Sequence, residues 1–136
     1  MTATIDPADV YHLLRAVLEE LPPGRATLER EPVYGRCLLI PVRPGAAHIY
    51  ALGSVSRCEI GIVELTHSHF DDRDEAMAFC RAIIRGELEY TVWYDGDRVM
   101  RAQRHHSKPG IVDVHEALFM KPLSELRQER VRFEPY

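Results

Sequence analysis

A change in hydrophobic periodicity constrains the fold of this chain more than any other feature. Residues 6–21 have the apolar spacing of an amphipathic helix, with Asp6 as a possible cap and Pro7 at the first helical position. The segment Pro22-Pro23-Gly24 ends this pattern. The apolar stripe consists of Val10, Leu13, Leu14, Val17, Leu18 and Leu21. A helix with one apolar face needs a sheet or a second helix to cover it.

From Arg25 to Thr66 the apolar residues alternate instead, which indicates strands. We expect strands near residues 26–31, 36–42, 48–56 and 58–66. Their connections are too short for helical crossovers, so the pairing should be antiparallel. In the last of them Cys58, Ile60 and Ile62 share one face, and the run Ile62-Val63-Glu64-Leu65 suggests a bulge near Val63 or burial on both faces.

A second helix and a hairpin follow. The helix begins at Asp71 or Asp72, with Glu75 completing a capping box on Asp72, and ends at Gly86. Its apolar stripe consists of Ala76, Phe79, Cys80, Ile83 and Ile84. Strands over residues 88–94 and 99–102 then flank the turn signal Asp95-Gly96, and a two-residue loop there would place Trp93 opposite Arg98.

The tail supports a short edge strand over residues 111–114 and a short helix over residues 122–131. The whole pattern predicts one α+β domain over residues 1–136. Its antiparallel sheet of about five to seven strands carries two main helices on one face, in the order α-β-β-β-β-α-β-β-(β)-α.

Charge, cysteine content and the N-terminus limit the classes of function. The net charge of −4 lacks the general attraction to polyanions of nucleic-acid and membrane binders. The three cysteines Cys37, Cys58 and Cys80 form no Cys-x-x-Cys pair, so we expect buried reduced thiols. With no signal-peptide pattern and no long apolar run, a cytoplasmic location and no membrane partner are expected.

The segment Thr66-His67-Ser68-His69-Phe70-Asp71-Asp72 is the strongest chemical signal. It resembles the front of the Thr-His-x-His-x-Asp-His zinc motif of the metallo-β-lactamase family. The resemblance covers seven residues, and Asp72 stands where the family has its last histidine. It implies a metal-dependent hydrolase in which His67, His69 and Asp71 would hold zinc or manganese and activate a water molecule.

His105, His106, His115 and Asp113 are the groups left to complete such a site. The alternative interpretation is structural: His67 and His69 lead into the helix, and Asp71 and Asp72 satisfy the free amides of its first turn. We favour this second interpretation, under which no cofactor is expected.

Other catalytic patterns are absent from the sequence, which contains no Gly-x-Ser-x-Gly elbow, phosphate loop or dinucleotide motif. A basic run beside Tyr90, Trp93 and Tyr94 leaves single-stranded nucleic-acid binding as a second alternative. The run consists of Arg98, Arg101, Arg104, His105, His106 and Lys108.

We therefore expect a non-catalytic protein-binding module, of the kind by which small bacterial proteins neutralise a toxin as immunity proteins or escort a substrate as chaperones. Aromatic residues and arginine dominate interface energies. The candidate binding residues are Trp93, Tyr94, Arg98 and Arg101 on the hairpin and the acidic residues Asp71, Asp72, Asp74 and Glu75. The acidic group would suit a basic partner, and a second copy of the chain is a further alternative.

Overall fold

The computed structural model describes residues 10–31, 35–53, 57–105, 114–116 and 121–136, with residues 114–116 described as backbone only. It has an α+β fold in which two helices and two antiparallel sheets follow the expected element order. The sequence pattern predicts one sheet, whereas the strands divide into a five-stranded and a four-stranded sheet.

The five-stranded sheet is a meander in which each strand pairs with the next along the chain. Its strands are β1 (Ala26–Arg30), β2 (Cys37–Pro41), β3 (Ile49–Gly53), β4 (Cys58–Ile62) and β5 (Thr66–Phe70). The expected strand over residues 58–66 is thus two strands. Between them the chain turns at Val63–Leu65, and the Leu65 N–H donates to the Ile62 carbonyl over 3.0 Å. Neither a bulge nor burial on both faces explains the break in alternation.

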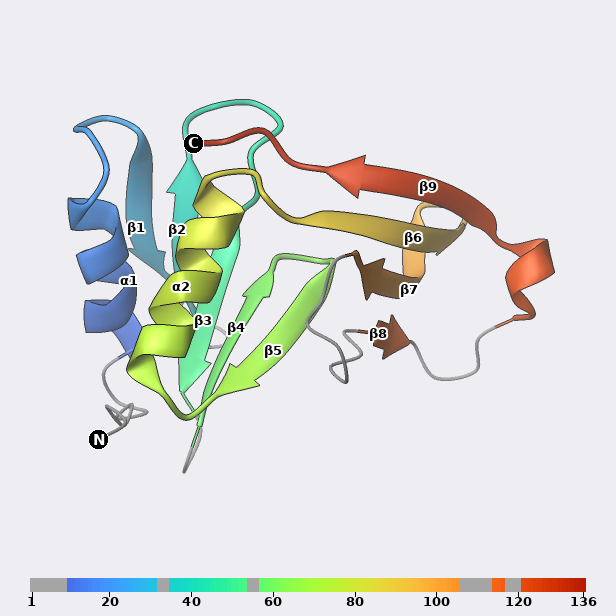
Figure 1. The fold of residues 1–136 in the computed structure, drawn as a ribbon, viewed down its shortest axis with the longest axis horizontal. Helices are drawn as coiled ribbons and strands as arrows, with labels where there is room; N and C mark the ends of the chain where they lie inside the picture. Colours follow the sequence, from blue (N-terminus) through green and yellow to red (C-terminus); the bar gives the residue numbers. More distant parts are fainter. Residues whose placement is uncertain (1–9, 32–34, 54–56, 106–113, 117–120) are drawn as a thin grey trace.

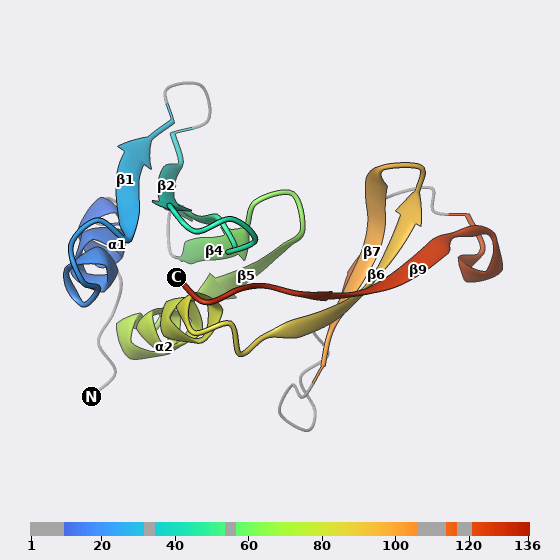
Figure 2. The same cartoon turned by 90° about the horizontal axis from the view of Figure 1, so that it is seen from above.

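Both helices, α1 (Val10–Glu19) and α2 (Arg73–Ile84), cover one face of this sheet (Figures 1 and 2). We call the two helices and these five strands the body. The predicted cap residues Asp6 and Pro7 of the first helix lie outside the described residues. The buried stripes of the helices meet alternate side chains of the strands, and burial of each such aliphatic side chain contributes about 1.5–3 kcal/mol. The centre of this core consists of Leu13, Leu14, Val17, Leu39, Ile49, Cys58, Ile60, Cys80 and Ile83.

The ends of α2 confirm the sequence signals for its boundaries. Asp72 is the N-cap, and its side chain accepts a hydrogen bond from the Asp74 N–H over 3.0 Å. At the other end Gly86 has a φ of 67°, where a side chain would be strained. Its N–H donates to Ile83, and the Glu87 N–H donates to Ala82, which is the Schellman arrangement.

The second sheet, which we call the arm, extends away from the body in both views (Figures 1 and 2). Its strands lie in the order β8-β7-β6-β9. The two central strands, β6 (Glu89–Asp95) and β7 (Arg98–Arg104), are consecutive in the sequence and form the expected hairpin. The outer strands are β8 (Val114–Glu116) and β9 (Arg127–Arg132).

The tail differs from the expected helix over residues 122–131. Only Leu123–Glu125 is helical, as a 3-10 turn, and β9 pairs with β6 from Glu89 to Tyr94. Local helix propensity was outweighed by the free hydrogen-bonding edge that β6 offers. After β9 the chain returns to the body, where the Tyr136 N–H donates to the Ile84 carbonyl over 2.9 Å.

Candidate functional site

The outer face of the five-stranded sheet, which the helices leave uncovered, holds the two histidines of the motif. His67 and His69 lie on the same side of β5, as the alternation predicted, and point away from the helices, while Thr66 points into the core. The strand pairing places His69 opposite Glu59 and His67 opposite Gly61 on β4. The ligand atoms of Glu59, His67 and His69 all lie within 4.8 Å of one another. We call these three residues the His–Glu cluster.

Asp71, the third ligand that the motif implied, is not part of this cluster. It lies in the bend after β5, where the chain has left the sheet face. Of the groups that might have completed a metal site, His105 instead lies within hydrogen-bond distance of Thr91 on the arm. His106 and Asp113 lie outside the described residues, as does the side chain of His115.

Tyr50 and Arg36 extend the cluster across the sheet. The Tyr50 hydroxyl donates to Oε2 of Glu59 over 2.7 Å, and Nε2 of His69 lies 3.2 Å from Oε1. Burial, reinforced by the bond to Glu59, raises the pKa of Tyr50, so its hydroxyl stays protonated as a donor. Arg36 lies over the Tyr50 ring at 5.0 Å and makes a two-bond contact with Glu31, over 3.0 and 2.9 Å.

A pocket of about 240 Å³ opens beside the cluster. Arg36, Tyr50 and His67 line it together with the β4–β5 turn residues Glu64 and Leu65. Glu64 has a φ of 63°, a left-handed conformation that is unfavourable for residues other than glycine. The pocket therefore has the guanidinium group of Arg36 and the imidazole of His67 in its wall, together with a turn in which Glu64 has an unfavourable backbone conformation.

The arm carries the aromatic residues predicted to bind a partner. Trp93 lies opposite Arg101, with the guanidinium carbon 4.9 Å from the ring centroid. The expected pairing of Trp93 with Arg98 is wrong, because the turn lies at Gly96-Asp97 and Arg98 therefore pairs with Asp95. The register shift at Trp93/Tyr94 then places Arg101 opposite Trp93. On the other face of the arm Tyr94 lies under Arg127 of β9, at 4.7 Å. Sequence reasoning missed Arg127 because it expected a helix there.

The acidic group is distant from these residues. Asp72 caps α2 and Asp74 and Glu75 lie in its first turn, where carboxylates interact favourably with the positive end of the helix. In Figure 1 this end of α2 lies on the opposite side of the molecule from the β6–β7 turn. The two groups of candidate binding residues therefore do not form one surface.

The cysteines are all buried, as expected, and free of disulfides. Burial raises the pKa of Cys37, and it raises the pKa of both Cys58 and Cys80 to about 12. Because the thiolate is the reactive form, none of these thiols suits a nucleophilic role at neutral pH.

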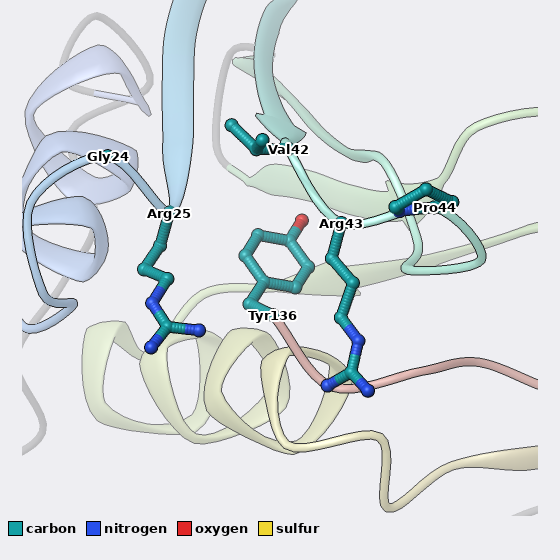
Figure 3. A pocket seen from close by; sticks show the side chains of 6 residues that line it. All are labelled: Gly24, Arg25, Val42, Arg43, Pro44 and Tyr136. Carbon is teal, nitrogen blue, oxygen red and sulfur yellow. The ribbon is translucent and has the colours of Figure 1, made fainter.

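A second pocket, of about 290 Å³, lies where the C-terminal segment meets the sheet (Figure 3). Its walls include Arg25, Val42 and Arg43, which surround the ring of Tyr136. The Tyr136 hydroxyl donates to the Ala47 carbonyl over 2.5 Å, and Arg43 donates to the Pro135 carbonyl over 3.3 Å. These polar contacts hold the segment in place, and the described residues that line the pocket include no acidic side chain and no histidine.

Comparisons of the chain with known protein families, curated proteins and solved structures find no match. No described helix is long and apolar enough to cross a membrane.

Proposed function

We propose that this chain is a non-catalytic protein-binding module whose contact surface is the arm. The observation that carries the proposal is the pair of partly exposed aromatic rings beside the β6–β7 turn, each stacked under an arginine. Trp93 pairs with Arg101 on one face and Tyr94 with Arg127 on the other. Aromatic residues and arginine are enriched at interface centres, where they contribute most of the binding energy.

Charge pairing on the arm favours a protein partner over single-stranded nucleic acid. Three arm cations already contact carboxylates: Arg130 contacts Glu89 at 2.9 Å, Lys121 contacts Asp95 at 3.2 Å, and Arg127 contacts Glu129 at 3.3 Å. A nucleic-acid groove requires cations available to phosphates along its length. A mixed-charge surface with aromatic centres suits a folded protein, as in a toxin-neutralising or chaperone-like module.

The test is a pull-down from the source organism with wild-type chain and with Trp93→Ala, Tyr94→Ala and Arg98→Glu. We expect a partner whose affinity falls at least about tenfold in the Trp93 variant, since interface hot spots contribute about 2 kcal/mol or more. The matched control is Asp71→Asn combined with Asp74→Asn, which alters the distant acidic group. A partner that is retained by the arm variants but lost by the control would overturn the choice of the arm. Recovery of no specific partner would overturn the binding-module proposal itself.

A further inference from the structure

We propose that Glu59, His67 and His69 bind one divalent transition-metal ion, of the zinc class, on the outer face of the five-stranded sheet. This site is independent of the arm and does not rest on its proposed binding role. The antiparallel pairing of β4 with β5 fixes the three positions, because directly paired residues project to the same face. His67 and His69 are two residues apart on one strand, and Glu59 lies across from His69.

Gly61 allows the Tyr50 ring to lie close against β4, beside the cluster. It pairs with Tyr50 on one side and with His67 on the other. A Cβ atom at Gly61 would lie 2.6 Å from Cε1 of Tyr50 and 2.1 Å from the carbonyl oxygen of Thr66. The Tyr50 ring therefore occupies the place where a side chain would stand, and from there its hydroxyl reaches Glu59.

Tyr50 orients the carboxylate in the way that an outer-shell partner orients a metal ligand. Its hydroxyl binds Oε2 of Glu59, while Oε1 faces His69. Ligating carboxylates are generally held by such second contacts, whose loss typically weakens metal affinity 10- to 100-fold. The Tyr50 ring is in turn covered by Arg36, which Glu31 holds through two hydrogen bonds.

The separations require only side-chain rotation for metal binding. Zinc ligands lie about 2.0–2.2 Å from the ion, which places tetrahedral ligand atoms about 3.4 Å apart. Oε1 of Glu59 and Nε2 of His69 are already 3.2 Å apart, and no pair in the cluster exceeds 4.8 Å. The side chain of His69 is 43% exposed, so it can rotate towards an ion without disturbing the core.

The donor set selects the class of ion. Two imidazoles and one carboxylate suit zinc and its transition-metal neighbours, whereas magnesium and calcium prefer oxygen ligands alone. Three protein ligands leave a fourth position of the tetrahedron for water, as in open zinc sites. That position can be filled from solvent, since the cluster lies on the uncovered face of the sheet.

The experiment is calorimetric titration of the full chain with Zn²⁺ at mildly alkaline pH, with Mg²⁺ as the hard-cation comparison. We expect one Zn²⁺ per chain and no measurable Mg²⁺ binding. His67→Ala, His69→Ala and Glu59→Gln should each weaken Zn²⁺ binding by at least about tenfold. Tyr50→Phe, which retains the ring and removes the hydroxyl, should weaken it about tenfold through the orientation of Glu59.

Two control variants separate this cluster from the motif and from other histidines. His48→Ala removes an exposed histidine immediately before β3 of the same sheet that is not part of the cluster, and Asp71→Asn removes the carboxylate that the motif implied. Both should leave Zn²⁺ affinity within about twofold of wild type. Equal binding by wild type and by His67→Ala, or a loss in Asp71→Asn as large as that in Glu59→Gln, would overturn the proposal.

Melting curves with and without Zn²⁺ keep the result interpretable. An ion that binds only the folded chain raises Tm, so wild type should gain stability with Zn²⁺ and the ligand variants should not. In chelator His67→Ala and His69→Ala should melt with wild type, because both side chains are exposed on the sheet face. If a histidine variant has a lower Tm than wild type in chelator, the Zn²⁺ affinities of Glu59→Gln and Tyr50→Phe, which change the side chains least, test whether the site exists. Wild-type affinity in both would reject the site.

Discussion

The two faces of the five-stranded sheet use the same strands for opposite purposes. On β4 the side chains of Cys58, Ile60 and Ile62 are at most 2% exposed beneath the helices. Of the residues between them, Glu59 belongs to the series of polar contacts that runs from Arg36 through Tyr50 to His69, and Gly61 leaves room for the Tyr50 ring. Alternation along one strand thus separates a face that stabilises the fold from a face that is free to carry a site.

The largest expected effect comes from the inner face. Ile60→Ala removes a fully buried side chain from the centre of the core and should lower the free energy of unfolding by about 2–5 kcal/mol, measured by urea denaturation. The neighbouring isosteric change Glu59→Gln on the outer face should cost less than about 1 kcal/mol. If the two changes cost the same, the division of roles between the faces is wrong.

Gly61→Ala tests whether the outer face is also closely packed at one point. The added Cβ would meet the Thr66 carbonyl and the Tyr50 ring, so we expect a loss of about 1–3 kcal/mol in unfolding free energy. The same change in a Tyr50→Ala background should cost less, because the contact with the ring has been removed. A double-mutant cycle measures this coupling, and simple additivity would show that Tyr50 does not depend on the glycine.

Local sequence signals predicted where helices and strands end better than they predicted which strands pair with one another. The cap at Asp72 and the left-handed stop at Gly86 follow from a few adjacent residues, and both are confirmed. The hairpin turn was expected at Asp95-Gly96 and lies one residue later, at Gly96-Asp97. The strand β9 was missed, because its pairing with β6 depends on residues far away in the chain. The register shift beside Trp93, which places Arg101 rather than Met100 opposite the ring, has no signal in the local sequence.

The candidate site shows the same limit. Alternation correctly placed His67 and His69 on one side of an extended segment, but the motif suggested Asp71 as the third residue. The structure brings Glu59 there instead, because the hairpin folds about Glu64 and residues equidistant from that turn face each other. Recognition of a turn in the run Ile62-Val63-Glu64-Leu65 would have predicted this pairing.

Glu64→Gly should stabilise the turn that creates the site. Glu64 has a φ of 63°, and glycine adopts this conformation without the steric penalty of a side chain. We expect a gain of roughly 1 kcal/mol in unfolding free energy, the lower end of the strain at such positions. Glu64→Ala is the control, since it removes the charge and keeps the Cβ. An equal gain in both variants would assign the effect to charge and leave the backbone unstrained.

The smallest expected effect is electrostatic and lies on the helix layer. Arg81 of α2 makes two hydrogen bonds, over 2.8 and 3.0 Å, with Glu20 just after α1, and this contact lowers the Glu20 pKa from its ordinary 4.5. A lowered pKa in the folded state means that the contribution to stability is present above the ordinary value and is lost as pH falls through the folded one. Glu20→Gln should therefore reduce Tm slightly at neutral pH and have no effect in strong acid. High salt should also diminish the difference, because the pair is exposed to solvent. A difference in Tm that persists unchanged in acid would assign it to packing between the helices, the same source of stability as the inner face of the sheet.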